Sequence, residues 1–414
     1  MCKLLVLLLV MMLPVTAEAA RRRPRSRVKP RTPVQKRAPA SSQPTPMPLV
    51  APVTEEEIPG FPWRVPAPPI RPTPLDEIVF AAVGDIMLGS TFPDATGEFL
   101  PPNDGATLLA EVTPILASAD VAFGNLEGPM IDGGTSEKCA AGTAGRCYAF
   151  RMPTRYGVYL KTAGFDVLGV ANNHATDFGM AGRATTRLVL ASLGIQTTGD
   201  IGAIAHFLVK GTKVAVVALA TYPTFYNLNE LAEARRLVAE LAGRADIVVV
   251  SFHGGAEGAA YQRVPFGAEQ FLGENRGDLR TFAHAMVDAG AHLVFGHGPH
   301  VVRGMEMYKG RLIAYSLGNF ATYGSFNLSG PNGLSLILEV RLGTNGAFRA
   351  ARIHPVKQEK PGGPLLDREG QIIPLLRELS RADFGDTAGH ITANGWVCPA
   401  GVAAAGACED VGSR

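Results

Sequence analysis

Carboxylate, carboxamide and imidazole side chains follow five short apolar runs of this 414-residue sequence. They lie in the segments Gly84-Asp85, Gly124-Asn125-Leu126-Glu127-Gly128, Asn172-Asn173-His174, His253-Gly254-Gly255 and Gly296-His297-Gly298-Pro299-His300. A mixed set of oxygen and imidazole ligands suits borderline divalent ions such as Mn²⁺, Fe²⁺ or Zn²⁺. Two such ions can activate a water molecule and hold both oxygens of an in-line displacement. The pattern therefore predicts a site for one or two divalent metal ions and a hydrolytic reaction.

Each of these residues also has an ordinary structural role, which is the alternative interpretation. Asp85, Asn125 or Asn173 alone would be typical of a turn. Of the nine histidines, four lie in the polar segments: His174, His253, His297 and His300. The other five, which we assign to the surface or the core, are His206, His284, His292, His354 and His390. Because polar segments recur after five apolar runs, a shared site is favoured over separate turns.

The apolar runs are short and rich in β-branched residues, which is typical of strands buried on both faces. They are Ile78–Val83, Val121–Phe123, Val167–Val170, Val214–Leu219, Ile247–Phe252, Leu293–Phe295, Leu312–Leu317 and Leu334–Val340. Helical patterns are found at Asn229–Ala245, at Leu279–Ala289 with Gly290 as its C-terminal cap, and at Ile372–Arg381. Alternating strands and helices predict an α/β domain. Ligands of such domains bind beyond the carboxyl ends of the strands, where the polar segments begin.

Six motifs occur in order within roughly residues 77–355: GDIMLG (Gly84–Gly89), GNLEGP (Gly124–Pro129), NNHATDFG (Asn172–Gly179), HGGAE (His253–Glu257), GHGPHV (Gly296–Val301) and YSLGNF (Tyr315–Phe320). Together they resemble the CapA-type capsule-synthesis family, whose members are associated with poly-γ-glutamate capsule biosynthesis. That family looks like a divergent branch of the calcineurin-like metallophosphoesterases. The resemblance implies a four-layer αββα sandwich, with two stacked sheets and helices outside.

The resemblance also implies a set of metal ligands: Asp85, Glu127, Asn173, His253, His297 and His300. Glu127 is preferred to Asn125 because an ionised carboxylate can bridge two cations and an amide cannot. Met87 stands where the related enzymes have a histidine, and a thioether is a poor ligand for hard ions. One of the two metal positions is therefore weakened. The last two histidines are three residues apart, where the related enzymes have a spacing of two.

Further roles follow from the same resemblance. His174 matches a general acid near the leaving group, and we expect Asp177 to orient its ring. Four residues are weaker candidates for substrate contact: Asn125, Arg151, Glu257 and Asn319. Glu257 is alternatively an outer base or a turn cap, and Asn319 a turn residue. Three more arginines are cations that suit an anionic substrate, with surface ion pairs as the alternative: Arg276, Arg280 and Arg303.

The N-terminus predicts export. Residues 1–19 read as a signal peptide, with Lys3 before the apolar stretch Leu4–Val15 and the small-x-small pattern Ala17-Glu18-Ala19 at the end. A membrane anchor is the alternative, but a span needs about 20 apolar residues and this stretch is interrupted by Pro14. We therefore expect a periplasmic or extracellular protein associated with the cell envelope.

Residues 20–76 are rich in Pro and Arg and predict a disordered linker. The chain has 39 Lys and Arg and 37 Asp and Glu, but ten of the basic residues and one acid lie in residues 1–37. The remaining residues therefore hold 29 basic and 36 acidic groups, a net charge of −7. The basic tail is expected to be a solvated spacer or to contact the anionic envelope or membrane surface. Export and the lack of interleaved aromatic residues argue against a nucleic-acid partner.

The cysteines predict disulfides in an exported protein. Cleavage of the signal would remove Cys2 and leave an even number, for which Cys139–Cys147 and Cys398–Cys408 are the favoured pairs of three possible connectivities. Zinc binding is the alternative, but neither pair has two-residue spacing or nearby histidines. The predicted organisation is a CapA-like domain over 77–360 and a C-terminal extension with a local disulfide over 361–414.

Taken with the resemblance, the site predicts a secreted, metal-dependent hydrolase-like protein that acts in the synthesis, processing or anchoring of an anionic surface polymer. The polymer or its precursor is the expected partner, with other capsule-synthesis proteins as possible further partners. The bond would be a phosphoester or an amide of a polyglutamate-like chain. The alternative is a non-catalytic module that binds such a polymer through a metal ion and arginines, and the methionine at position 87 favours it.

Overall fold

The computed structural model describes residues 76–93, 99–136, 138–139 and 147–399. The predicted signal peptide (1–19) and the predicted linker (20–76), apart from its last residue, lie outside these ranges. Within these ranges no helix is both long enough and apolar enough to cross a membrane.

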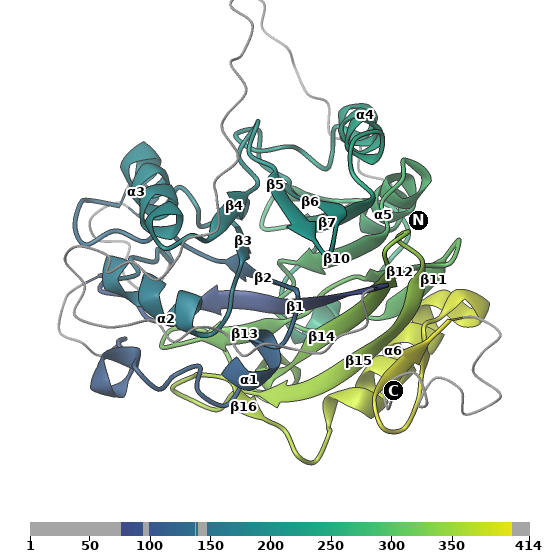
Figure 1. The fold of residues 1–414 in the computed structure, drawn as a ribbon. Helices are drawn as coiled ribbons and strands as arrows, with labels where there is room; N and C mark the ends of the chain where they lie inside the picture. Colours follow the sequence, from purple (N-terminus) through teal and green to yellow (C-terminus); the bar gives the residue numbers. More distant parts are fainter. Residues whose placement is uncertain (1–75, 94–98, 137, 140–146, 400–414) are drawn as a thin grey trace, which may run out of the picture. The chain divides into compact units, whose positions relative to one another are not determined.

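Two sheets form the centre of the described structure (Figure 1). The first has the order β17-β18-β15-β14-β1-β2-β3-β4, with β13 paired to β1 and β16 to β15. Its strands are β1 (Glu77–Met87), β2 (Val121–Leu126), β3 (Val167–Gly169), β4 (Gln196–Thr198), β13 (Asn319–Thr322), β14 (Leu334–Gly343), β15 (Phe348–Lys357), β16 (Leu365–Leu366), β17 (His390–Ile391) and β18 (Trp396–Cys398). Strands β1 to β4 run parallel, β14 runs antiparallel to β1, and β15 runs antiparallel to β14.

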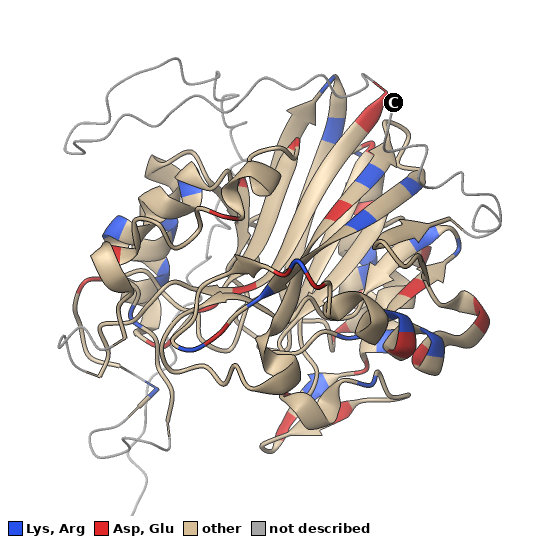
Figure 2. Cartoon of the chain, turned by 90° about the horizontal axis from the view of Figure 1, so that it is seen from below, with Lys and Arg blue, Asp and Glu red and all other residues tan. Residues whose placement is uncertain are grey.

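The second sheet has the order β11-β12-β10-β7-β6-β5, and its central strands β6, β7, β10 and β12 run parallel. Its strands are β5 (Ala205–Val209), β6 (Thr212–Ala220), β7 (Ile247–His253), β10 (Leu293–His297), β11 (Met305–Tyr308) and β12 (Arg311–Ala314). A separate pair, β8 (Glu269–Phe271) and β9 (Glu274–Gly277), follows β7. In Figure 2 much of the strand surface is tan, and charged residues lie on helices, on loops and on parts of several strands.

The sheets pack face to face through one apolar core. Phe80 of β1 and Phe123 of β2 lie 6.0 and 4.9 Å from the ring of Phe295 in β10. All three are fully buried. Burial of apolar area drives this packing, at roughly 25 cal/mol per Å². Because both faces of the central strands are buried, they carry the continuous apolar runs seen in the sequence.

Helices cover the outer faces (Figure 1). The helices are α1 (Thr113–Leu116), α2 (Gly157–Thr162), α3 (Gly179–Ser192), α4 (Leu231–Ala242), α5 (Leu279–Asp288) and α6 (Ile372–Phe384). Leu116 of α1 and Leu160 of α2 pack on the outside of the first sheet. Val238 of α4 and Phe282 of α5 pack on the outside of the second. The predicted four-layer αββα sandwich is therefore confirmed.

The segment after residue 360 joins this sandwich. Leu376 and Leu379 of α6 lie in the core between the sheets, and β18 pairs with β15. The structure contains the predicted disulfide between Cys139 and Cys147. Cys398 is also disulfide-bonded, and its predicted partner, Cys408, lies outside the described residues.

Candidate metal centre

The strand register brings polar residues of both sheets to one end of the sandwich. Asp85 in β1 is the register partner of Asn125 in β2 and of Asn319 in β13. In the second sheet His297 of β10 is the register partner of His253 in β7. The two sheets meet where Nδ1 of His297 lies 3.4 Å from Oδ1 of Asp85. The prediction that these strand ends converge therefore matches the structure.

Gly84 makes room for the first of these residues. A Cβ atom built on Gly84 would lie 1.9 Å from the carbonyl oxygen of Gly318. That same oxygen accepts a hydrogen bond of 2.9 Å from the backbone N–H of Asp85. Only glycine permits this close approach, and the approach fixes the position of the Asp85 backbone beside the YSLGNF segment.

His300 joins two carboxylates in the middle of the cluster. Its Nδ1 lies 3.1 Å from Oδ2 of Asp85, and its Nε2 lies 3.4 Å from Oε1 of Glu127. The same Glu127 oxygen is 3.7 Å from Nε2 of His253. One ligand atom from each of Asp85, Glu127 and His300 lies within 4.8 Å of the others, a spacing that suits a metal ion.

The buried polar atoms of this cluster lack the partners that burial normally requires. Within the described ranges, Oδ2 of Asp85, both carboxylate oxygens of Glu127 and both ring nitrogens of His253 and His297 have no hydrogen-bond partner. Each of these four residues is at most 1% exposed. Several unpaired oxygens and imidazole nitrogens in one place are the donor set of a divalent cation. The residues present therefore fit a metal ion.

Charges within the cluster shift the protonation of its members. Burial alone would raise the pKa of Asp85, but the adjacent imidazoles of His297 and His300 hold it well below its ordinary value. Burial raises the pKa of Glu127 to about 7 and, with the nearby charge of Arg276, lowers the pKa of His253 to about 3. Burial opposes charge on His300, but the two carboxylates raise its pKa to about 10. Metal binding would release that proton.

Two asparagines hold His300 in an unusual backbone conformation. Its φ angle is +57°, in the left-handed region that disfavours side chains other than glycine. The His300 carbonyl accepts hydrogen bonds from Nδ2 of Asn319 (3.2 Å) and of Asn332 (3.3 Å). Oδ1 of Asn319 lies 3.0 Å from the His300 ring Nδ1. Asn319, predicted as a weak substrate contact, is therefore placed to position His300, a predicted metal ligand.

A chain of amides supports the carboxylate of Asp85. Nδ2 of Asn125 donates to Oδ1 of Asp85 at 2.8 Å, and Nδ2 of Asn172 donates to Oδ1 of Asn125 at 3.2 Å. Asn125, another weak substrate candidate, is thus hydrogen-bonded to Asp85, the first predicted metal ligand. The predicted ligand Asn173 has a buried Oδ1 without a hydrogen-bond partner in the described ranges.

The predicted acid, His174, lies beside its predicted orienting residue. Its Nδ1 is 2.8 Å from Oδ2 of Asp177, which also accepts the backbone N–H of Phe150 at 2.8 Å. The Phe150 ring lies against the imidazole, with ring centres 4.2 Å apart. Nζ of Lys138 is 3.3 Å from the same ring nitrogen and 3.4 Å from Asp177. A carboxylate, a cation and an aromatic face therefore fix this ring.

Residues 79–323 match the family model described as bacterial capsule synthesis protein PGA_cap. The chain belongs to this family. It is 29% identical over 272 residues to the capsule biosynthesis protein CapA of Bacillus anthracis, covering 61% of this chain and 61% of that protein. It is 28% identical over 280 residues to the PGA biosynthesis protein CapA of Bacillus subtilis (strain 168), covering 63% of this chain and 68% of that protein.

The chain thus spans about three fifths of the length of the Bacillus anthracis relative. Among solved structures, the NAD nucleotidase of Haemophilus influenzae is similar with a TM-score of 0.37 and 11% identity, covering 74% of this chain and 56% of that one. A likeness at this level bears on neither fold nor activity. Membership of the PGA_cap family therefore rests on the sequence match.

In this PGA_cap member, position 87 contributes to the core and not to the cluster. Met87 is fully buried among apolar residues on the helix-covered side of the first sheet. Its side chain therefore lies in the core and is not one of the polar groups gathered at the strand ends.

The four predicted arginines divide into two groups. Arg151 donates to Thr91 and Gly134, and Arg280 donates to the carbonyls of Val264 and Asp383. Arg303 is bound by Glu269 and two backbone carbonyls. These three arginines therefore form hydrogen bonds that hold parts of the fold together. Arg276 has more nitrogens without partners: its Nη1 donates to Glu257 at 2.8 Å, while Nε and Nη2 have no hydrogen-bond partner in the described ranges, where Arg280 lacks one only at Nε.

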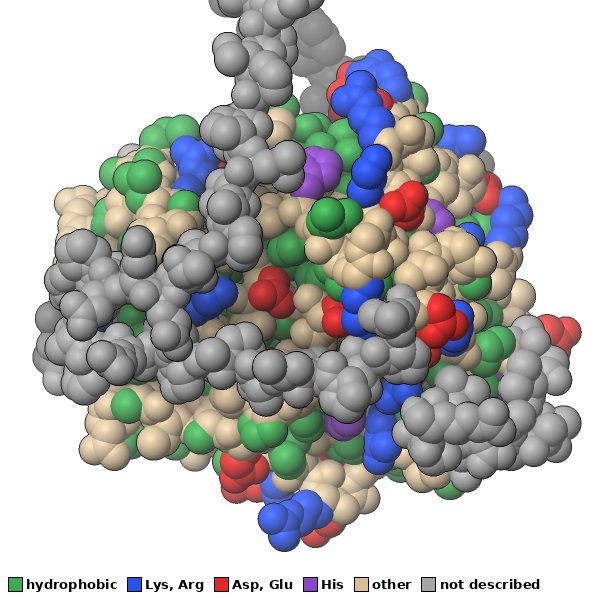
Figure 3. Space-filling model, viewed as in Figure 1, with side chains coloured by type: hydrophobic (Ala, Val, Ile, Leu, Met, Phe, Trp, Pro, Cys, Tyr) green, Lys and Arg blue, Asp and Glu red, His purple; other side chains and the backbone are tan. Residues whose placement is uncertain are grey.

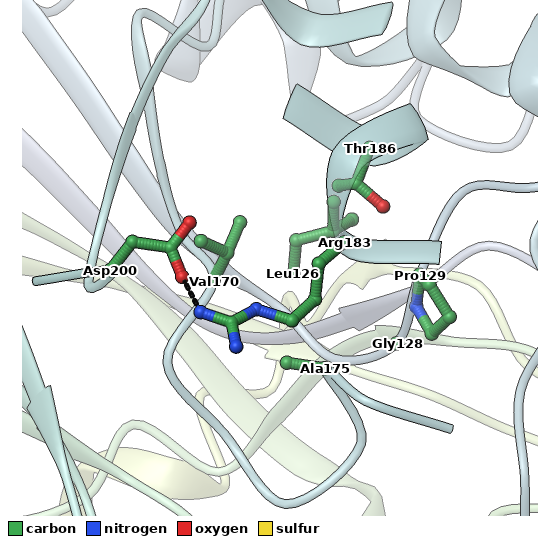
Figure 4. A pocket seen from close by; sticks show the side chains of 8 residues that line it. All are labelled: Leu126, Gly128, Pro129, Val170, Ala175, Arg183, Thr186 and Asp200. Atoms are coloured by element: carbon green, nitrogen blue, oxygen red, sulfur yellow. Dashed lines mark hydrogen bonds and ion pairs between the residues drawn. The ribbon is translucent and has the colours of Figure 1, made fainter. Parts of the chain in front are cut away.

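A small cavity elsewhere is lined by charged residues that, unlike those of the cluster, are paired with each other (Figure 4). It is lined by Leu126, Gly128, Pro129, Val170, Ala175, Arg183, Thr186 and Asp200. Arg183 pairs with Asp200, which Arg187 also contacts at 2.6 Å. On the described surface in Figure 3, acidic and basic side chains are scattered, with basic ones gathered over α4. The buried cluster is thus the stronger candidate for chemistry.

Sequence reasoning missed Asn172, Asn332, Lys138 and Phe150. Asn172 lies in the NNHATDFG motif, but the resemblance assigns the ligand role to its neighbour Asn173, so no role was predicted for Asn172. Asn332 and Lys138 lie outside every strand-end motif, so local sequence carried no signal for them.

Proposed function

We propose that this PGA_cap member is an exported, metal-dependent hydrolase that acts on an anionic cell-surface polymer or its precursor. One observation carries the proposal, namely the buried carboxylates and imidazoles at the strand ends that lack partners among the described residues. The relatives named as capsule and PGA biosynthesis proteins support the polymer pathway. Other proteins of such a pathway are proposed as partners.

The cluster would hold the cation through a defined set of residues: Asp85, Glu127, His253, His297 and His300, with Asn173 as a further candidate. When bound, a divalent cation supplies Lewis-acid polarisation of a phosphoryl or carbonyl oxygen. Asn125 and Asn319 keep Asp85 and His300 in place. One or two ions of Mn, Fe or Zn fit this donor set.

His174 is proposed to donate a proton to the leaving group. Asp177 and Lys138 both contact Nδ1, so Nε2 is the nitrogen left to face a substrate. The leaving group is the alcohol of a phosphoester or the amine of a glutamyl amide. Protonation helps either one to depart, because an alkoxide or an amide anion is a poor leaving group.

A non-catalytic metal-containing module that binds an anionic envelope polymer is the second candidate. The burial of Met87 in the core favours it, because one ligand position of the related enzymes is lost. The supported His174–Asp177 pair favours the hydrolase, because polymer binding alone does not require an oriented acid.

The deciding experiment is metal analysis of the protein after anaerobic purification and reconstitution with Mn²⁺. We expect bound metal in wild type and its loss in His297→Ala and His300→Ala. His206→Ala is the matched control, because that histidine is exposed and outside the cluster. Absence of metal from wild type would falsify the proposal.

A second measurement separates the hydrolase from the binding module. Wild type and His174→Ala are compared on an activated phosphodiester and on poly-γ-glutamate, with product release as the signal. Turnover by wild type that falls in His174→Ala supports the hydrolase. Equal background from both, with polymer still bound, supports the module.

Export is part of the proposal and has its own test. Residues 1–19 would direct secretion, and the basic residues after them would contact the anionic envelope or membrane surface. Cell fractionation should find the protein outside the cytoplasm, and replacing Leu4–Val15 by polar residues should retain it inside. Equal distribution of both forms would contradict export.

A further inference from the structure

The disulfide between Cys139 and Cys147 lies beside the segment of the proposed acid. Both cysteines belong to one apolar cluster with Phe178, the residue that directly follows Asp177. The first cysteine is buried in that cluster, and the Cα atoms of the two cysteines lie 5.7 Å apart. A disulfide keeps its two Cα atoms within about 7 Å of each other. The two chain segments that flank this bond are therefore held together next to Asp177.

The segment on the Cys139 side is hydrogen-bonded to Asp177. Oγ of Ser136 donates to the backbone carbonyl of Asp177 at 3.0 Å. The same Oγ accepts the N–H of Cys139 at 3.0 Å. Ser136 is buried, so neither bond competes with bulk water. One hydroxyl group thus connects the first cysteine to the residue that orients the acid.

The segment on the Cys147 side reaches the same residue. Phe150, three residues further along the chain, donates its N–H to Oδ2 of Asp177 at 2.8 Å. Its ring also lies against the imidazole of His174, with ring centres 4.2 Å apart. The contacts of Ser136 and Phe150 approach Asp177 from the two sides of one cross-link. The disulfide therefore limits how far these contacts can move relative to each other.

Lys138, the residue before the first cysteine, brings a cation to the acid. Its Nζ lies 3.2 Å from the carbonyl oxygen of Asn173, 3.3 Å from Nδ1 of His174 and 3.4 Å from Oδ1 of Asp177. That Oδ1 is buried and has no hydrogen-bond partner among the described residues, so the ion pair offsets its charge. The Lys138 side chain is 36% exposed. A long, partly exposed side chain loses rotamer freedom when it is held in one place, so its backbone must be well fixed.

We propose that the Cys139–Cys147 disulfide and Lys138 are positioning elements of the His174–Asp177 pair. They keep Oδ2 of Asp177 at 2.8 Å from Nδ1 of His174. An imidazole that is held through one nitrogen presents the other in a fixed direction. The inference rests on the proposed function and deepens it, because it makes the proposed proton donor depend on an intact disulfide.

The test removes each positioning element separately in the full chain. The double variant Cys139→Ser with Cys147→Ser removes the cross-link. Lys138→Met removes the cation and keeps an unbranched side chain, whereas Lys138→Arg keeps the cation. Cys398→Ser with Cys408→Ser is the matched control. Cys398 is disulfide-bonded and belongs to a different apolar cluster, and Cys408 is its predicted partner.

The kinetic measurement uses metal-loaded protein and a substrate that wild type turns over. We expect the double variant of Cys139 and Cys147 and the variant Lys138→Met each to lose about tenfold in kcat. KM should change less, and metal content should stay as in wild type. Lys138→Arg should restore most of kcat, and the control pair should behave as wild type. Unchanged kcat in both test variants contradicts the inference.

The second measurement does not depend on turnover. Nitrogen NMR of metal-free protein reports the ring of His174, whose signals are assigned with His174→Gln. These signals should shift in Lys138→Met and in the double variant of Cys139 and Cys147, and stay in place in the control pair. Signals that match wild type in both test variants overturn the inference. If no sample turns over any substrate, the hydrolase proposal fails, and the ring signals alone decide on the positioning role.

Reduction of the disulfide covers the case in which the double variant does not fold. Dithiothreitol breaks the S–S bond, delivers two electrons and two protons to form two thiols, and itself becomes a cyclic disulfide. The sample is the control pair of Cys398 and Cys408, so that the loss of that second bond does not contribute. Reduction should shift the His174 signals and speed hydrogen exchange at the amide of Phe150, and reoxidation should reverse both. Signals and exchange that do not respond to reduction contradict the inference.

Discussion

Two pairs of buried charged residues lie near the same end of the sandwich and differ in how many of their polar atoms have hydrogen-bond partners. Arg303 and Glu269 form a pair with contacts of 2.7 and 2.8 Å, and Arg303 also donates to the carbonyls of Tyr261 and Ala256. Asp85 and Glu127 are as deeply buried, but several of their oxygens have no hydrogen-bond partner among the described residues. Burial alone therefore does not distinguish them.

The bonding of these buried charges separates a structural role from a functional one. A buried charge is tolerated when its partners are built in, and such a pair fixes structure. A buried charge without partners costs stability unless something else supplies them. The Arg303 pair ties Ala256 and Tyr261 to β8, whereas the Asp85 cluster leaves its ligand atoms for a cation.

Breaking the satisfied pair should give the largest effect. Arg303→Met leaves Glu269 buried without its counter-charge, with only the N–H of Ala256 still bound to it, which should lower the free energy of unfolding by about 3–5 kcal/mol. Replacing Glu269 by Met as well removes the stranded charge and should restore most of that loss. Urea denaturation measures both. A double variant as unstable as Arg303→Met would show that the loss comes from packing and not from the charge.

Removing a ligand from the unsatisfied cluster should act on metal binding more than on the metal-free fold. His297→Ala should weaken metal affinity by about 100-fold, on the order of 2.7 kcal/mol at 1.36 kcal/mol per factor of ten. In wild type, metal at 1,000 times its Kd should stabilise the fold by about 4 kcal/mol. Thermal unfolding with and without Mn²⁺ measures this difference. Equal metal-dependent stabilisation in His297→Ala would remove it from the ligand set.

Asp177→Asn tests the support of the proposed acid. The amide keeps an oxygen to accept the N–H of Phe150 but loses the charge beside His174. We expect kcat to fall about 10–100-fold, the usual size for an orienting partner, with metal content unchanged. The conservative Asp177→Glu should restore part of the activity. A parallel loss of metal would instead place Asp177 in the support of the cluster.

Asn319 and Asn332 give a matched pair at the strained residue. Both bind the His300 carbonyl, but only Asn319 also contacts the ring. Asn319→Ala should therefore weaken metal affinity by roughly 10-fold, and Asn332→Ala by less. Calorimetric titration with Mn²⁺ compares the two. An equal loss would mean that the carbonyl contacts, and not the ring contact, set the geometry of His300.

The same pair of asparagines shows which features of the site can be predicted from the sequence. The strand at Ile78–Val83 and the residue after it, Asp85, are predictable because a continuous apolar run ends in a carboxylate. β15 is not, because its buried and exposed residues alternate irregularly and it contains Pro355. Asn332 reaches His300 only through the packing of a distant loop, and no local pattern records that contact.

The ligand set illustrates the same limit. His253 and His297 follow the strand pattern, so sequence spacing brings both to the site. The hydrogen bonds of Arg303 and the two nitrogens of Arg276 that lack a partner in the described ranges depend on tertiary contacts, so the two arginines look alike in the sequence. The sequence therefore predicts which residue types lie at the site. The three-dimensional contacts decide which of their polar atoms have no hydrogen-bond partner among the described residues.

The smallest effect should come from a charged pair that is neither buried nor short of partners. Arg244 and Glu240 lie one turn apart at the end of α4, with contact at 2.9 Å and side chains 75% and 55% exposed. Arg244→Gln should change the free energy of unfolding by only about 0.3–0.5 kcal/mol, because water and salt screen the pair. Urea denaturation at low and high salt measures this. A loss as large as that of Arg303→Met would mean that charge pairing, and not the burial of an unpaired group, governs stability here.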